Sequence, residues 1–256
     1  MVICKNVETV NNNYEKAMQG HCYAVGVGPG APDLLTIRAV RIIETADVIV
    51  APRSSKADTS LALETVRHLL HPDQTIIDHQ YAMIRDEEIT IDRWKPVAET
   101  MVNCCKSGKS VVQITIGDPL IYSTVSYVLP FLFESLDEDK IHIIPGISAF
   151  QISASKFGMA LTLQEDRLCL MPATDIHAVS KALDNCETLV LYKCAKQLHT
   201  LAELLTARNL DKQCRVVCYA EQDQKETVYN DIHTASASNN GYMATAIIFS
   251  KRKKWM

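Results

Sequence analysis

Long apolar runs are missing from this sequence of 256 residues. No stretch reaches the roughly 18 apolar residues that a membrane-spanning helix requires, so we expect no membrane partner. The first 20 residues hold no long apolar segment ahead of a small-residue cleavage site, and we therefore expect no export signal. These two absences favour a cytoplasmic protein.

Glycine and proline are also few, with nine of each, which excludes a fibrous or low-complexity chain. Hydrophobic residues make up 47% and charged residues 22%, a mixture typical of globular proteins. An excess of positive charge is missing too, because 26 Lys and Arg face 30 Asp and Glu. The net charge of −4 argues against a nucleic-acid partner held by bulk positive charge, although a local basic pocket stays possible.

Cysteine is abundant, but paired metal-binding spacings are absent. The nine cysteines include no Cys-x-x-Cys pair, and Cys214 and Cys218 lack a matching second pair. We therefore expect no metal site. The simpler interpretation is that these are reduced thiols, packed as small hydrophobic side chains in a cytosolic protein.

The first 150 residues alternate between short apolar runs and helical periodicity. Strands are expected at residues 23–27, 47–51, 75–77, 110–116 and 141–144. Helical patterns start at Leu34, with Pro32 and Asp33 at the helix start, and recur at residues 61–70, 94–105 and 125–133, where Pro130 is a possible break. This alternation predicts a mostly parallel sheet with helices on both faces.

The second half has a different pattern. Strands are expected at residues 168–171, 188–192, 214–219, 226–232 and 244–249, and helices at 175–183 and 197–207. The turn Asn239-Asn240-Gly241 before the last strand predicts an antiparallel component. We expect an N-terminal extension over residues 1–20, an N-terminal α/β domain over 21–155 and a C-terminal α/β domain over 156–256.

The first of three notable turns reads Gly26-x-Gly28-Pro29-Gly30-Ala31 and formally satisfies a dinucleotide-binding fingerprint. That fingerprint wants an acidic residue at the end of the next strand, whereas Asp47 begins it. Pro29 also removes one backbone amide from the loop. A nicotinamide-dependent oxidoreductase and a purely structural turn both remain alternatives at this point.

The other two turns also follow predicted strands. Gly117-Asp118-Pro119 places a carboxylate at a strand end, and Pro145-Gly146 leads into Ile147-Ser148-Ala149 at a helix start. Carboxyl ends of parallel strands are where ligands bind in such sheets. Each turn alone is a weak signal.

Taken together, GVGPGAPDLLT, GDPLIYST and PGISAF, in this order and at these distances, resemble the tetrapyrrole methylase family of S-adenosyl-L-methionine-dependent enzymes. The resemblance covers residues 22–250. GDPxxYST and PRSSKADTSLA at 52–62 are most similar to the branch that methylates carbon 20 of precorrin-2 or cobalt-precorrin-2 in cobalamin biosynthesis. Ala31 is a departure, since many relatives carry Asp there.

The resemblance implies a two-domain α/β homodimer whose mostly parallel N-terminal sheet and mixed C-terminal sheet flank a cofactor cleft. It also implies a set of cofactor-binding positions. They are Pro29, Ile116, Gly117, Asp118, Ile121, Ser148, Ala149, Tyr192, Lys193, Ala220, Ala244 and Thr245. Lys193 stands where several relatives have Met.

The implied substrate is a tetrapyrrole carrying many carboxylates, with or without cobalt. Arg53, Lys56 and Arg85 are candidates to bind those carboxylates, since Arg grips a carboxylate with two parallel bonds. Tyr122 and Asp118 are the nearest candidates to accept the proton that carbon 20 loses, and Asp118 fits better as a contact of the cofactor, which leaves Tyr122 as the catalytic candidate. Two further alternatives stay open: methylation of another corrin-ring carbon, and a binding module without turnover, which only Ala31 favours.

Overall fold

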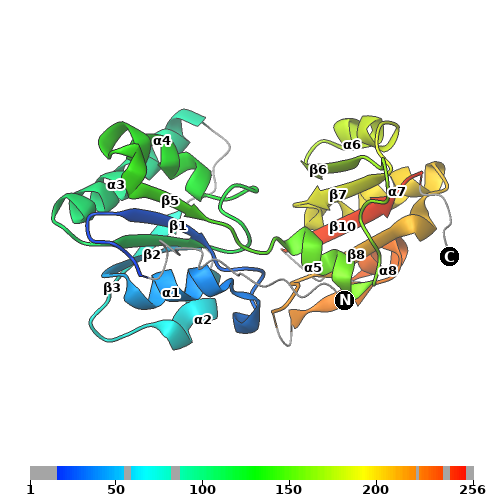
Figure 1. Ribbon diagram of the computed structural model, residues 1–256. Coiled ribbons are helices and arrows are strands. Elements are labelled where there is room, and N and C mark those ends of the chain that lie inside the picture. The colour runs from blue at the N-terminus through cyan, green and yellow to red at the C-terminus, as the bar shows by residue number, and fades with distance from the viewer. Residues whose placement is uncertain (1–15, 55–58, 82–86, 223–224, 239–242, 252–256) are drawn as a thin grey trace, which may run out of the picture. The chain divides into compact units, whose positions relative to one another are not determined.

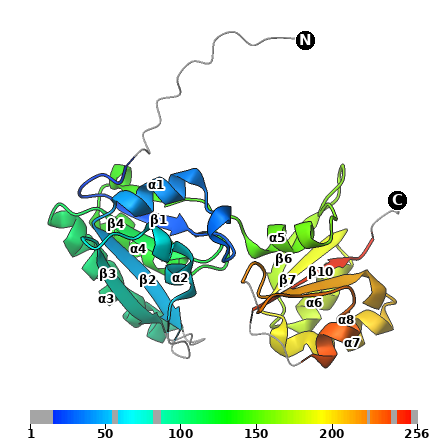
Figure 2. The same cartoon turned by 90° about the horizontal axis from the view of Figure 1, so that it is seen from below.

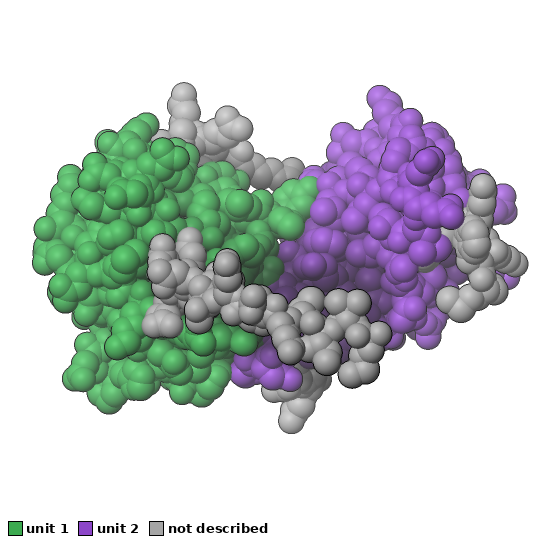
Figure 3. Space-filling view, in the orientation of Figure 1, with its two compact units in different colours: residues 1–28, 35–146 green, residues 29–34, 147–256 purple. Residues whose placement is uncertain are grey.

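The computed structural model describes residues 16–54, 59–81, 87–222, 225–238 and 243–251. The contacts divide the chain into two compact units, which Figure 3 shows in different colours. Unit 1 comprises residues 1–28 and 35–146, and unit 2 comprises residues 29–34 and 147–256. Each unit has its own sheet (Figure 1) and is described by itself.

Unit 1 is built on a five-stranded sheet with the order β3-β2-β4-β1-β5, in which every neighbouring pair is parallel. The strands are β1 (Cys22–Gly26), β2 (Val48–Ser54), β3 (Thr75–Tyr81), β4 (Val111–Thr115) and β5 (Ile141–Ile144). β1 and β4 are buried along their whole length, and β4 buries the polar Gln113 and Thr115 among its apolar residues. The predicted parallel sheet is confirmed.

Helices cover both faces of this sheet (Figures 1 and 2). One face carries α1 (Ile37–Thr45) and α2 (Leu61–Val66), which continues into the 3-10 turn η2 (Arg67–Leu69). The other face carries α3 (Glu87–Lys106) and α4 (Val125–Ser135), where Trp94 stacks on Tyr127 with 5.5 Å between ring centroids. The helix α4 continues through Pro130, which occupies an exposed position, so the possible break is not present.

Unit 2 holds a five-stranded mixed sheet with the order β6-β7-β10-β8-β9. Its strands are β6 (Leu168–Pro172), β7 (Thr188–Tyr192), β8 (Cys214–Cys218), β9 (Thr227–Tyr229) and β10 (Ala244–Phe249). Only β6 and β7 pair in parallel, while β10 is antiparallel to β7 and β8, and β9 is antiparallel to β8. The predicted antiparallel component is therefore present.

The two faces of this second sheet are covered by different helices. The larger core lies under α6 (Ile176–Leu183), α7 (Leu198–Ala207) and α8 (Ile232–Ala237). The opposite face packs on α5 (Ala149–Lys156), which contacts β10. Short 3-10 turns complete the chain: η1 (Pro32–Leu34), η3 (Glu138–Lys140), η4 (Ala195–Gln197) and η5 (Asp211–Gln213).

Several element boundaries differ from the sequence predictions because caps decide them. The first helix begins not at Pro32 but after Thr36, whose hydroxyl accepts a hydrogen bond from the amide of Ala39. The strand expected over residues 226–232 is cut short by Asp231, whose carboxylate accepts from the amide of Thr234 and starts α8. The predicted strand therefore ends earlier than expected, and its last expected residue, Ile232, is the first residue of a helix.

The division between the units also falls at a different place from the expected residue 155. It lies between Gly146 and Ile147, because α5 packs on unit 2 through Ile152 and Ala154. Residues 29–34 belong to unit 2 as well, since Leu34 packs beside Ile152. Within the described ranges, no helix combines the length and apolar character that crossing a bilayer requires.

The cysteines pack as the composition predicts. All eight that the structure describes are free thiols, and six of them are buried. Burial raises the pKa of Cys186 to about 11 and that of Cys194 to about 12, so both thiols stay protonated at neutral pH. Cys214 and Cys218 lie in the core of unit 2, and no cluster of metal-ligating side chains occurs among the described residues.

Candidate functional site

The neighbouring strands β1 and β4 of unit 1 lead into loops at their carboxyl ends. β1 and β4 are neighbours, but the chain leaves β1 toward the face covered by α1 and leaves β4 toward the opposite face covered by α4. Their following loops therefore diverge. Such a switch point is where ligands bind in open parallel sheets.

Two of the predicted glycine turns join at this switch point. Gly117 donates its amide to the carbonyl of Gly28 at 2.7 Å, and Gly28 donates back to Gly117 at 3.3 Å. Both glycines have φ near +70° (72° and 73°), a conformation that side-chain-bearing residues rarely adopt. The turns after β1 and β4 are thus a single hydrogen-bonded structure.

The third turn packs against the same backbone. A Cβ placed on Gly26 would lie 2.5 Å from the carbonyl oxygen of Gly117 and 2.7 Å from the amide nitrogen of Gly146. A Cβ on Gly146 would collide with the same Gly117 oxygen. The three turns that sequence analysis singled out therefore meet, at a spacing that only glycine permits.

Asp118 ties the second turn to the third. Its Oδ1 accepts a hydrogen bond from the amide of Leu120 at 2.9 Å, and its Oδ2 accepts from the amide of Gly146 at 3.1 Å. The half-buried carboxylate thus brings a negative charge to the switch point and holds two loops in place. Sequence reasoning proposed only a ligand contact for Asp118 and did not foresee this bracing role.

Tyr122 lies farther along the same loop. Its backbone is left-handed, with φ of 51°, and its side chain is 47% exposed. The next residue, Ser123, is buried, bonds to Thr115 at 3.0 Å and accepts from the amide of Val125. Ser123 therefore anchors the loop, while the Tyr122 side chain faces solvent on the surface of unit 1.

One of the three cations predicted to bind substrate is described. Arg53, on β2, donates from Nε to Oδ2 of Asp78 on β3 at 2.8 Å, so part of its guanidinium is engaged within the fold. Lys56 and Arg85 lie outside the described residues. Asp47, at the start of β2, bonds to the amide and hydroxyl of Ser110 (2.7 Å each), far along the strand from the position that a dinucleotide ribose requires.

In unit 2, the predicted cofactor positions share one edge of the sheet. β10 is antiparallel to both neighbours, so its start at Ala244 and Thr245 lies level with the ends of β7 and β8. Tyr192 ends β7, and Ala220 follows β8. Three neighbouring strands therefore bring these residues together.

The start of α5 is held at this same edge. The Tyr192 hydroxyl accepts a hydrogen bond from the amide of Phe150 at 3.4 Å, and Ser148 donates its amide to the side chain of Gln151 at 2.9 Å. Ser148 is buried and caps the helix, with Ala149 as its first residue. The structure thus gathers the predicted Ser148, Ala149 and Tyr192 within unit 2.

Left-handed backbone marks these loops. Of the six described non-glycine residues with positive φ, four follow the strands of the two predicted regions: Tyr122, Lys193, Tyr219 and Glu221. Each such residue costs about 1–3 kcal/mol and persists only where surrounding contacts fix it. Sequence reasoning missed Tyr219 and Glu221, because strain at a non-glycine residue has no sequence signature.

Sequence reasoning singled out the segment that begins at Pro29 but did not predict that it packs against the Ala220 turn. A Cβ on Gly30, whose φ is +144°, would lie 2.8 Å from the carbonyl oxygen of Glu221. Leu34 joins a small apolar cluster that contains Ala220 and Ile152. The segment that begins at Pro29 is therefore seated on unit 2 beside Ala220.

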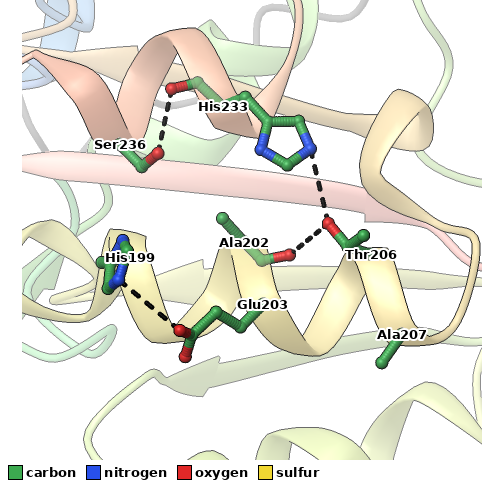
Figure 4. A pocket seen from close by; sticks show the side chains of 7 residues that line it. All are labelled: His199, Ala202, Glu203, Thr206, Ala207, His233 and Ser236. Atoms are coloured by element: carbon green, nitrogen blue, oxygen red, sulfur yellow. Dashed lines mark hydrogen bonds and ion pairs between the residues drawn. The ribbon is translucent and has the colours of Figure 1, made fainter.

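A depression elsewhere in unit 2 contains none of the predicted site residues. It measures about 540 Å³ and lies between α7 and α8 (Figure 4). His199 pairs with Glu203 at 3.5 Å, and His233 contacts the Thr206 hydroxyl at 3.4 Å. These exposed pairs stay within the wall of the depression and do not converge on a common point (Figure 4).

Comparison with known proteins identifies the group to which these features belong. The sequence pattern of the Tetrapyrrole (Corrin/Porphyrin) Methylases matches residues 21–233. The chain belongs to the tetrapyrrole methylase family. S-adenosylmethionine is the methyl donor of such methylases, and the dinucleotide alternative for the first turn is thereby set aside.

Curated relatives of this methylase match along nearly their whole length. The cobalt-precorrin-2 C(20)-methyltransferase of Salmonella typhimurium is 28% identical, with 93% of this chain and 98% of the relative covered. A protein of Methanocaldococcus jannaschii named "Probable cobalt-precorrin-2 C(20)-methyltransferase" is 30% identical, with 88% and 94% covered.

Solved structures confirm the two-domain methylase fold. A cobalt precorrin-4 methyltransferase has a TM-score of 0.66 at 19% identity, with 92% of this chain and 95% of that chain covered. Uroporphyrin-III C-methyl transferase from Thermus thermophilus, complexed with S-adenyl homocysteine, has a TM-score of 0.62 at 18% identity, with 89% and 96% covered. The family match and the shared fold together identify this chain as an S-adenosylmethionine-dependent methyltransferase.

The described residues fit such a cofactor. A sulfonium is cationic, and the Asp118 carboxylate lies at the switch point of unit 1. The close backbone approach among Gly26, Gly117 and Gly146 leaves no room for side chains between the three turns. Within unit 2, the small residues Ala149, Ala220 and Ala244 lie at the start of α5, after β8 and at the start of β10.

Proposed function

We propose that this methylase transfers a methyl group from S-adenosylmethionine to carbon 20 of precorrin-2, free or carrying cobalt. The observation that carries the proposal is the full-length match to two relatives named for that reaction, at 28% and 30% identity. The PRSSKADTSLA stretch and the GDPLIYST turn support the same branch. Reduced cysteines are consistent with a cytoplasmic enzyme.

In this proposal the three glycine turns bind and orient the cofactor. When bound, S-adenosylmethionine supplies a methyl on a sulfonium for an in-line displacement. In unit 1, Gly117 and Asp118 with Ile116 and Ile121 hold its methionine and ribose part. In unit 2, Pro29, Ser148 and Ala149 border it, and the adenine contacts come from Tyr192, Lys193, Ala220, Ala244 and Thr245.

The remaining tasks of the protein are to position the substrate and to bind its charged carboxylates. Carbon 20 of a reduced, electron-rich macrocycle is nucleophilic by itself, so the protein contributes mainly by fixing its position. Arg53, with Lys56 and Arg85, binds the substrate carboxylates. Tyr122, in its phenolate form, is the proposed acceptor of the proton lost from carbon 20, and its side chain is 47% exposed. We further propose that the enzyme acts as a homodimer.

The test is turnover with precorrin-2, with and without cobalt, and with S-adenosylmethionine labelled with ¹³C in the methyl group. We expect the label at carbon 20 by NMR. A label at another ring carbon would favour the second candidate, which the likeness to a precorrin-4 methyltransferase keeps open. Cofactor binding without turnover on either substrate would favour a binding module.

A further inference from the structure

A partly exposed ion cluster in unit 2 has no part in the functions assigned so far. The Lys156 ammonium, at the end of α5, lies 2.6 Å from Oε1 of Glu221 and 3.0 Å from Oε1 of Glu226. The three side chains are only 22–26% exposed. The hydrogen bond to Glu221, followed by that to Glu226, raises the pKa of Lys156, so the ammonium is charged at neutral pH.

The cluster closes on the turn that follows β8. The second oxygen of Glu226 accepts the backbone amide of Glu221 at 2.7 Å, and Gln222 donates its amide to the carbonyl of Tyr219 at 3.0 Å. Ala220 is thereby held inside a four-residue turn, Tyr219–Gln222. Because Tyr219 and Glu221 are both left-handed, this turn needs contacts from outside itself to persist.

The same helix supplies the apolar contacts of that turn. Ile152 and Lys156 are four residues apart on α5 and therefore lie on one face. Ile152 packs with Ala220 and Leu34, while Lys156 reaches the two carboxylates. The carbonyl oxygen of Glu221 in turn lies close to Gly30, in the segment that begins at Pro29, because a Cβ at Gly30 would be only 2.8 Å from it.

We propose that Lys156 is a positioning residue of the cofactor site, and this inference rests on the proposed function. By bridging Glu221 and Glu226, it fixes three segments in one arrangement: the Ala220 turn, the Pro29–Leu34 segment, and α5 with Ser148 and Ala149 at its start. Lys156 itself contacts neither cofactor nor substrate.

The expected consequence is a loss of affinity. A site that is correctly arranged for only part of the time binds its ligand more weakly in proportion to that fraction. Removing the ammonium leaves two carboxylates beside a strained turn, with no cation between them. The arrangement competent to bind the cofactor then becomes a minor one, although the sheet and the large core of unit 2 are unaltered.

The experiment titrates S-adenosylhomocysteine into the full-length protein by calorimetry. We expect Lys156→Met, which keeps the side-chain length without the charge, to raise the Kd about tenfold or more. Lys156→Arg should bind within about twofold of the parent, because a guanidinium also bridges two carboxylates. Arg208→Gln is the matched control, since it breaks a different ion pair of unit 2, with Asp184.

A second measurement separates positioning from general destabilisation. With substrate present, Lys156→Met should raise the KM for S-adenosylmethionine and leave kcat at saturating cofactor nearly unchanged. Should Lys156→Met not fold, Glu226→Gln is measured in the same way and is expected to weaken binding. If the parent binds and these variants bind equally well, or if Arg208→Gln weakens binding as much, the positioning role is overturned. If the parent itself does not bind S-adenosylhomocysteine, it is the proposed function that fails.

Discussion

At the scale of single residues, Asp118 has one role that the sequence predicts and another that the structure shows. As a carboxylate at a strand end, it was predicted to contact the cofactor. In the structure its two oxygens accept the amides of Leu120 and Gly146, so it also holds the loops that form the site. Its removal should therefore affect stability as well as binding.

We expect Asp118→Ala to lower the free energy of unfolding by about 1–3 kcal/mol, because two backbone amides lose their acceptor. Urea unfolding measures this change, and calorimetry with S-adenosylhomocysteine should show weaker binding in the same variant. Asp118→Asn keeps one acceptor oxygen, so its free energy of unfolding should lie between those of the parent protein and Asp118→Ala. Asp137→Ala, which breaks only an exposed pair with Lys140, is the control. Unchanged stability of Asp118→Ala would remove the bracing role.

At the scale of elements, a pair of histidines lies where the neighbouring strands β1 and β5 begin. Nδ1 of His21 and Nε2 of His142 are 2.9 Å apart, and Tyr23 stacks on His142. Burial and the neighbouring His21 lower the pKa of His142, while Asp139 opposes this shift. One ring must be neutral to accept the hydrogen bond from the other.

The sign of the pH dependence follows from that lowered pKa. The unfolded chain binds a proton on His142 more readily than the folded chain does, so stability is present above about pH 6.5 and is lost as the pH falls through the folded pKa. Urea unfolding between pH 7.5 and 5 measures this slope. We expect His142→Gln to flatten it, whereas His199→Gln, at a side chain 85% exposed, should not. An equal slope in all three proteins would contradict the assignment.

Elements themselves were largely predictable where one face or both faces of a strand are buried. The runs that became β5, β7 and β10 were placed at their observed residues, because short apolar segments between turn residues have few alternatives. The end of β9 and the start of α1 were not, because Asp231 and Thr36 decide them by capping. At the ends of helices and strands, a capping hydrogen bond decides the boundary even where the hydrophobic pattern would continue the element.

The meeting of the three turns was predictable, whereas the ion pairs between distant segments were not. A general rule places turns after neighbouring parallel strands at one edge, and the glycines follow from it. The pairs Arg53 with Asp78 and Lys156 with Glu221 join residues far apart in sequence, and no spacing reveals them. The sequence thus predicts that the three turns come together, but it does not predict the ion pairs between distant segments.

At the scale of the whole molecule, the proposed cofactor contacts come from segments of both units, including Pro29 after β1 and Gly117 after β4. A ligand that binds only the folded chain stabilises it by mass action, by about 2.7 kcal/mol at a hundredfold excess over Kd. For a chain of this size that corresponds to a rise in Tm of about 5–10 °C. Differential scanning calorimetry with S-adenosylhomocysteine should show this rise in the unfolding of both units, since each supplies contacts.

NADH, tested at the same concentration, should leave the transition unchanged. A rise confined to one unit would restrict the cofactor contacts to that unit, and a rise with NADH alone would return the first glycine turn to the dinucleotide interpretation.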